Sequence, residues 1–177
     1  MKDINIVFLD IDGVLQPYDA EMRFMSVDKS IIKELSEKFD TDYNKYNFYD
    51  VCAVYYDWKQ EAVDRLKYIL DETNSKIIIS SDWRNKFLPD KMKDLLKIQF
   101  LDQYYLADTP IFIKFHSIPQ TRSEEIRSSI KEYNINNFVV LDDLKDLQEY
   151  FPNNSVITHD YIKVSDMNNA IKILKKR

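Results

Sequence analysis

The chain has 177 residues and a formal net charge of −5, and 45% of its residues are hydrophobic and 31% charged. These values are typical of a soluble globular protein, and the length suits one domain over residues 1–177. The acidic balance argues against a broad nucleic-acid-binding surface, and no apolar run approaches the ~20 residues of a membrane span. The single cysteine, Cys52, excludes a disulfide within the chain. With no signal peptide visible, we expect a reducing, cytoplasmic location.

The first functional signal is an apolar run that stops at two carboxylates. Residues 6–9 predict a strand buried on both faces, and Asp10 and Asp12 follow it directly. Open α/β folds bind ligands at the carboxyl ends of their strands. Gly13 is the only glycine of the chain, which indicates a positive φ or the close approach of a ligand. An acidic turn is the simpler interpretation, but two crowded carboxylates repel each other and favour a cation.

The segment 16–56 is interpreted as a small cap-like insertion, too short for a large cap domain. Within it, Ser26 is expected to cap a helix that ends near Phe39. Residues 40–50 are polar and rich in tyrosine, and they predict a loop or a small lid. The tyrosines either stack on a base or sugar or pack this segment against the body of the protein. Asp57 is expected to cap the next helix.

A second buried strand is predicted at residues 76–79, and it ends in the hydroxyl pair Ser80 and Ser81. Pro89 predicts the first turn of the helix that follows. A short strand is expected at residues 111–113. Beyond it, Thr121 and a glutamate three residues later form a capping-box pattern at the start of another helix.

The third buried strand is predicted at residues 138–141, and Asp142 and Asp143 follow it. A short helix, an edge strand at 156–158 and a last helix capped by Ser165 complete the pattern. Because strands alternate with helices, we expect an α/β fold. It should be a three-layer, Rossmann-like, mostly parallel sheet with helices on both faces.

The three strand ends predict one polar crevice. The carboxyl ends of parallel strands lie along one edge of a sheet, so the four aspartates that follow the strands should meet there with the two serines. Such a cluster of oxygen ligands suits Mg²⁺, which binds carboxylates and keeps several waters. The metal would offset the repulsion among the carboxylates and hold a phosphate against them.

These motifs resemble those of the haloacid dehalogenase-like (HAD-like) phosphatase superfamily. Residues 8–14 (Phe-Leu-Asp-Ile-Asp-Gly-Val) are similar to its first motif, residues 77–80 to its second and residues 139–143 to its acidic motif. The three occur in the family's order and at strand ends. Residues 80–84, 121–126 and 141–143 most resemble the small HAD domains related to bacterial RNA-repair proteins.

The resemblance implies a role for each motif residue. Asp10 would attack phosphorus and form an aspartyl-phosphate, and Asp12 would protonate the leaving group and later activate water. Mg²⁺ would bind the Asp10 and Asp142 side chains and the backbone carbonyl of Asp12, with Asp143 as a further candidate. Ser80 would hydrogen-bond the transferring phosphoryl group.

The third motif departs from the family pattern, which has a basic residue, usually lysine, near the start of a helix. Arg122 is favoured for this role because a helix start attracts anions and arginine binds phosphate bidentately; Lys114 is the competitor. Ser81 either contacts phosphate or caps the next helix. Arg84 either anchors the substrate or forms an exposed salt bridge.

The leading hypothesis is a Mg²⁺-dependent phosphohydrolase acting on a phosphomonoester. A phosphorylated small molecule, a nucleotide or a nucleic-acid phosphate end are the candidate substrates, and no membrane partner is expected. Two other classes stay open. One is a receiver-like signalling domain, which the serines ending the second strand disfavour. The other is a catalytically weak accessory module for RNA processing.

Overall fold

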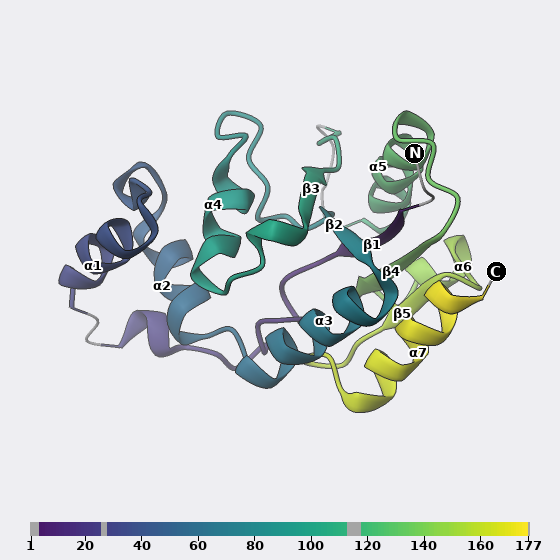
Figure 1. Cartoon of the computed structure of the whole chain (residues 1–177), viewed down its shortest axis with the longest axis horizontal. Helices are drawn as coiled ribbons and strands as arrows, with labels where there is room; N and C mark the ends of the chain where they lie inside the picture. The colour runs from purple at the N-terminus through teal and green to yellow at the C-terminus, as the bar shows by residue number, and fades with distance from the viewer. Residues whose placement is uncertain (1–3, 26–27, 113–117, 177) are drawn as a thin grey trace.

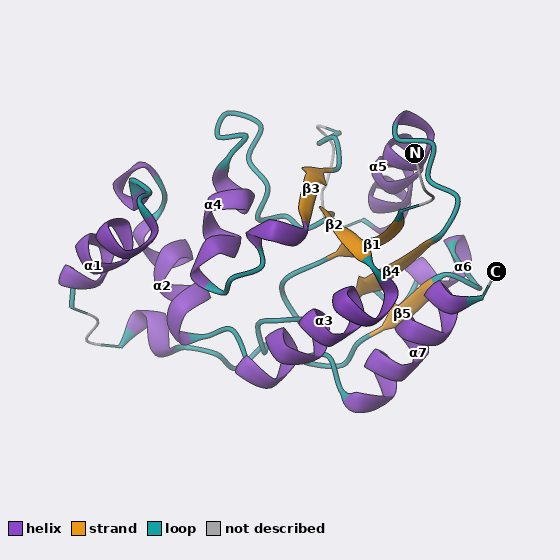
Figure 2. Ribbon diagram, viewed as in Figure 1, coloured by secondary structure: helices purple, strands orange, loops and turns teal. Residues whose placement is uncertain are grey.

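The computed structural model describes residues 4–25, 28–112 and 118–176. Its centre is a five-stranded sheet in which every pairing is parallel and the strand order is β3-β2-β1-β4-β5. The strands are β1 (Asn5–Leu9), β2 (Ser75–Ile79), β3 (Tyr105–Asp108), β4 (Phe138–Asp142) and β5 (Ser155–Ile157). Figures 1 and 2 show helices on both faces of this sheet. The predicted α/β, Rossmann-like architecture is confirmed.

The three strands predicted from continuous apolar runs form the middle of the sheet. In β1, Val7 and Leu9 pack into one hydrophobic cluster, whereas Ile6 and Phe8 pack into a second cluster on the opposite face. All four side chains are almost fully buried. A strand with both faces covered cannot show polar alternation, and this explains the run of apolar residues that marks β1.

Two pairs of helices cover the sheet. Leu66 and Leu174 belong to the larger cluster, and they lie in α3 (Gln60–Thr73) and α7 (Val164–Lys175). Ile126 and Leu147 belong to the smaller cluster, in α5 (Pro119–Glu132) and α6 (Leu147–Tyr150). No helix in the described ranges is long and apolar enough to cross a membrane.

The predicted insertion forms a helical layer at the end of the molecule opposite α6 and α7 (Figure 1). The helical segments of the insertion are η1 (Met22–Phe24), α1 (Ser30–Phe39), η2 (Tyr43–Lys45) and α2 (Phe48–Tyr56). Helices α1 and α2 pack on α4 (Lys91–Ile98), which is followed by η3 (Asp102–Tyr104). The insertion shares the larger hydrophobic cluster with the sheet.

The expectation of a loop at residues 40–50 is wrong, because this segment contains η2 and the start of α2. Its tyrosines are divided between core and surface. The Tyr43 hydroxyl donates to the Asp94 carbonyl at 2.8 Å, and the Tyr46 hydroxyl donates to the Asp94 carboxylate at 2.7 Å. Both rings are buried, whereas Tyr49 is half exposed. Packing therefore explains Tyr43 and Tyr46.

The strand expected at 111–113 is also misplaced. The strand beside β2 is β3, four residues of mixed burial at the edge of the sheet. Its pairing is extended by the Thr109 backbone N–H, which donates to the Ile79 carbonyl at 2.8 Å. Pro110 then follows, and proline has no N–H to continue a ladder. Ile111 and Phe112 lie outside any strand, and residue 113 lies outside the described residues.

Two predicted helix caps serve other purposes. The Asp57 carboxylate accepts the Arg23 backbone N–H at 3.2 Å and lies 3.4 Å from its Nε, so α3 begins later, with Lys59 at the N-cap. Thr121 lies inside α5, which begins at Pro119. Proline suits a first turn because no N–H is needed there.

Three other predicted helix starts also differ from those in the structure. Helix α4 begins at Lys91, two residues after Pro89, and α7 begins at Val164, one residue before Ser165. The predicted cap Ser26 lies outside the described residues, and α1 begins at Ser30. The Asp28 carboxylate accepts the Ser30 backbone N–H at 2.9 Å.

Candidate active site

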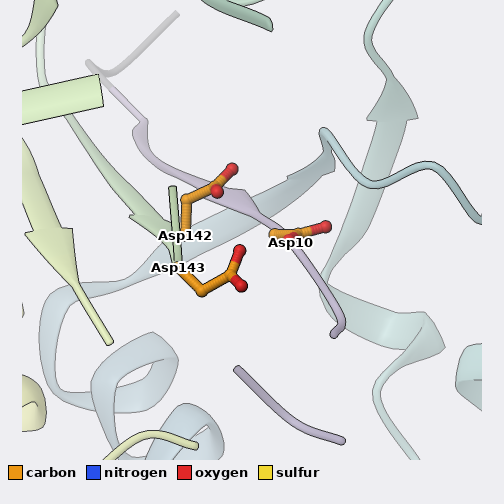
Figure 3. A group of neighbouring side chains, drawn as sticks. All are labelled: Asp10, Asp142 and Asp143. Atoms are coloured by element: carbon orange, nitrogen blue, oxygen red, sulfur yellow. The ribbon is translucent and has the colours of Figure 1, made fainter. Parts of the chain in front are cut away.

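The acidic residues of two neighbouring strands meet at the carboxyl edge of the sheet. Asp10 follows β1, and its backbone N–H donates to the Leu141 carbonyl at 3.0 Å, which holds the two strand ends together. Asp142 ends β4 and Asp143 follows it. One carboxylate oxygen from each of these aspartates lies within 4.8 Å of the others (Figure 3).

Burial makes this acidic group costly to ionise. Asp10 is 5% exposed and Asp142 is fully buried. Burial raises the pKa of Asp10 to about 6, although Arg122 opposes the shift. Burial, and then the neighbouring Asp10 carboxylate, raise the pKa of Asp142 well above its usual range. A cation at this edge would favour the ionised forms of both groups.

Arg122 brings one positive charge into the acidic group. Its Nη1 lies 3.3 Å from Asp10 Oδ1 and 3.1 Å from Asp142 Oδ2, and its Nη2 lies 3.1 Å from Asp82 Oδ1. The side chain comes from the first turn of α5 and is 2% exposed. Its Nε is buried without a hydrogen-bond partner in the described part of the chain. Lys114, the competing candidate, lies outside the described residues.

The two serines after β2 have different surroundings. The backbone N–H of Ser80 donates to the Leu9 carbonyl at 2.9 Å, so Ser80 sits beside the end of β1. Its hydroxyl is buried and has no hydrogen-bond partner among the described residues. The Ser81 hydroxyl accepts the Trp83 backbone N–H at 3.3 Å, which orders the turn after β2. Burial raises the pKa of Asp10, and interaction with Ser81 opposes this shift.

Asp12 is held apart from the acidic group. Trp83 Nε1 donates to its Oδ2 at 2.9 Å, and Gln16 Nε2 donates to its Oδ1 at 2.8 Å. Each carboxylate oxygen thus has one donor, which fixes the plane of the group. Burial raises the pKa of Asp12, while the bond from Trp83 lowers it.

Gly13 has the predicted positive φ, and neighbouring protein atoms leave no room for a side chain there. Its φ is +69°, and a Cβ there would lie 2.6 Å from the Tyr18 hydroxyl oxygen and 2.8 Å from Asp143 Cβ. The Tyr18 hydroxyl donates to Asp143 Oδ2 at 2.6 Å. The Thr158 hydroxyl donates to the Gly13 carbonyl at 2.7 Å. The turn after β1 is thereby tied to the ends of β4 and β5.

Arg84 points away from the acidic group and into the protein. Its Nη2 lies 2.9 Å from Glu125 Oε2, and both side chains are almost fully buried. Its Nε donates to the Ser81 carbonyl at 2.5 Å, and its Nη1 donates to the carbonyls of Thr109 and Pro110 at 3.0 and 3.1 Å. The salt bridge of Arg84 is therefore buried and not exposed as expected, and these contacts favour a structural role over substrate anchoring.

A pocket of about 290 Å³ opens beside Asp12. It lies between the strand edge, which contributes Asp12 and Trp83, and the insertion, which contributes aromatic and polar side chains. The lining residues are Asp12, Gln16, Arg23, Phe24, Asn47, Tyr49, Asp50 and Trp83.

Several residues of this region carried no signal in the sequence. Tyr18 meets Asp143 across 125 positions of the chain, and Glu125 meets Arg84 across 41. Gln16 lies four residues from Asp12, but it sits in a loop whose course was not predictable. Only a folded chain shows that these residues converge.

A comparison with known families covers nearly the whole chain. The family model described as the HAD domain in Swiss Army Knife RNA repair proteins matches residues 6–167. No curated protein and no solved structure matches the chain. The matched range runs from β1 into α7 and contains every site residue named above, and it confirms the predicted resemblance. HAD domains are in general phosphatase-type hydrolases. The chain belongs to the family of HAD domains found in Swiss Army Knife RNA repair proteins.

Proposed function

We propose that this protein is a Mg²⁺-dependent phosphomonoester hydrolase that forms an aspartyl-phosphate on Asp10. The observation that carries the proposal is the contact of Arg122 with both Asp10 and Asp142 inside a buried acidic group. Burying charges at this density is costly, because the charged groups lose their hydration. Strongly perturbed carboxyl groups at a strand edge are typical of catalytic sites.

The donor set fits Mg²⁺. Asp10, Asp142 and Asp143 offer only carboxylate oxygens, the ligands that this ion prefers. Arg122 supplies one positive charge against these three carboxyl groups, so a negative excess remains for a divalent cation to balance. The backbone carbonyl of Asp12 is a further proposed ligand, since its carboxylate is held by Gln16 and Trp83. When bound, Mg²⁺ would neutralise phosphate charge and orient the phosphoryl group for in-line attack.

The phosphoryl group would be bound by donors that the protein itself leaves unused. The Ser80 hydroxyl and Arg122 Nε are both buried and lack hydrogen-bond partners in the described ranges. An unpaired buried donor is costly unless a ligand satisfies it. Oxygens of a phosphoryl group placed beside Asp10 would accept from both. The same donors would stabilise the charge that spreads over these oxygens in the transition state.

Two aspartates would divide the proton and nucleophile chemistry. An Asp10 carboxylate oxygen attacks phosphorus as the bond from phosphorus to the leaving oxygen breaks, and Asp12 gives that oxygen its proton. Water then attacks the aspartyl-phosphate and passes a proton back to Asp12. The products are inorganic phosphate and free Asp10. The raised pKa of Asp12 suits a group that must hold a proton before the first step.

The substrate is proposed to be a nucleotide or the phosphate end of an RNA, a suggestion that rests on the family description. The general phosphatase claim is tested with p-nitrophenyl phosphate, Mg²⁺ and EDTA, using wild type and Asp10→Asn. Turnover that needs both Mg²⁺ and Asp10 supports the proposal. Equal turnover by the variant would refute the role of Asp10.

A further inference from the structure

We propose that the pocket beside Asp12 is the leaving-group subsite and that Phe24 and Tyr49 select a flat aromatic ring, such as a nucleobase, in the leaving group. This inference rests on the proposed function, since it takes Asp12 as the proton donor. It adds a binding site in the insertion, with two residues that determine specificity.

The position of the pocket follows from the chemistry. A proton donor must lie within hydrogen-bond reach of the oxygen that leaves. Asp12 lines the pocket, whereas Asp10, Asp142 and Asp143 do not. The pocket therefore extends from the proton donor and away from the acidic group. A leaving group whose oxygen contacts Asp12 has its remaining atoms in this space.

The aromatic lining indicates what the pocket binds. Phe24 and Tyr49 have ring centroids 5.4 Å apart and rings tilted by 45°, yet they are 62% and 50% exposed. Two large rings that contact each other but stay open to solvent leave faces on which a planar ligand can stack. The guanidinium of Arg23 lies over the Phe24 ring, 4.9 Å from its centroid, and restrains that ring.

The charges of the pocket favour an uncharged ligand with polar edges. Arg23 faces the Asp57 carboxylate at 3.4 Å and donates to Gln16 Oε1 at 2.8 Å. Asp50 pairs with Lys91 at 2.7 Å. Because these charges are already paired, the pocket offers little attraction to a second phosphate. Its volume of about 290 Å³ is at the lower end of ligand pockets, which suits one ring system.

The matched substrates are adenosine 5′-monophosphate and ribose 5-phosphate, because both release a primary alcohol and only one carries a base. We expect wild type to favour the nucleotide in kcat/KM by about tenfold or more, as stacking on aromatic side chains contributes strongly to base binding. Phe24→Leu and Tyr49→Leu keep apolar bulk but remove the flat ring, and each should lower this ratio toward one. A 5′-phosphorylated RNA oligonucleotide distinguishes a free nucleotide from an RNA end as the natural source of the base.

Tyr68→Leu is the control, because Tyr68 is 53% exposed on α3 and does not line the pocket. A wild-type ratio near one, or a ratio that neither pocket variant changes, would overturn the subsite. If no phosphate is hydrolysed at all, the proposed function fails separately. Tryptophan fluorescence titration with adenosine then tests the pocket alone: saturable binding that both pocket variants weaken supports it, and no binding overturns it.

Discussion

Arg122 Nη1 lies between two acids that the chain places 132 residues apart, 3.3 Å from Asp10 Oδ1 and 3.1 Å from Asp142 Oδ2. One guanidinium thus joins the proposed nucleophile to the proposed metal ligand. The acids raise the pKa of Arg122 more than its burial lowers it, so this group stays charged at any pH in which the protein folds. The site therefore carries a permanent internal cation.

Removing this cation should damage both stability and activity. Arg122→Ala leaves Asp10 and Asp142 buried without their partner, and breaking a buried ion pair in this way costs about 3 kcal/mol. We expect a lower melting temperature in EDTA, partial recovery on adding Mg²⁺, and at least a hundredfold loss in kcat/KM for p-nitrophenyl phosphate. Arg127→Ala is the matched control, since Arg127 is exposed on the same helix. Retention of full activity by Arg122→Ala would move the third-motif role to Lys114.

Gly13→Ala should destabilise the protein and loosen the metal site. A positive φ disfavours alanine, and the new Cβ would lie 2.8 Å from Asp143 Cβ. Together these effects should cost about 2 kcal/mol. Because Asp143 must move, the Mg²⁺ concentration for half-maximal activity should rise several-fold.

A substitution at Tyr18 distinguishes the two steric contacts that would destabilise Gly13→Ala, one with Tyr18 and one with Asp143. Tyr18→Ala removes the hydroxyl that would lie 2.6 Å from the new Cβ but keeps the Asp143 side chain that would lie 2.8 Å from it. Placing Gly13→Ala in this background should therefore recover only part of the stability, as measured by thermal unfolding. Full recovery would mean that Asp143 imposes no restriction on Gly13.

Asp108 offers a test of pH dependence outside the proposed catalytic groups. Burial raises its pKa to about 6, against the bond from Tyr105 and the charges of Arg84 and Lys91. The native state therefore binds this proton more tightly than the unfolded chain does. The stability it contributes is complete below about pH 4 and is lost as the pH rises through about 6.

Asp108→Asn cannot ionise, yet it keeps an acceptor for the Tyr105 hydroxyl, which lies 3.1 Å from Oδ1. We expect the variant to be more stable than wild type by about 2 kcal/mol at pH 7.5 and equal to it near pH 4. Urea unfolding at both pH values measures the difference. Asp64→Asn, at an exposed position, is the control substitution. A constant difference between Asp108→Asn and wild type at both pH values would contradict the assignment.

The central strands could be predicted because their burial leaves a simple pattern. Residues such as Phe8 and Val140 are covered on both faces, and so β1 and β4 consist of apolar runs. The edge strand β3 has no such pattern, since Leu106 is 42% exposed while its neighbours are half-buried. The apolar residues Ile111 and Phe112 match the sequence pattern of a buried strand better than the residues of β3 do.

The position of the acidic residues could be predicted from the strand topology, whereas individual side-chain contacts at the site could not. Once three strands are parallel, the residues after them must share one edge, and Asp10 and Asp142 could be placed together on that basis. The exposed Tyr18, by contrast, contacts Asp143 from a loop. Asp57 was expected to cap a helix, but its carboxylate pairs with Arg23. Such pairings depend on side-chain reach across the fold, which no local pattern encodes.

The central claim is that Asp10 is a nucleophile that works with Mg²⁺. The most direct measurement is hydrolysis of p-nitrophenyl phosphate by wild type and Asp10→Asn, each with Mg²⁺ and with EDTA, with both proteins shown to be folded by circular dichroism. We expect turnover only in wild type with Mg²⁺. Turnover by folded Asp10→Asn, or wild-type turnover undiminished in EDTA, would contradict the account.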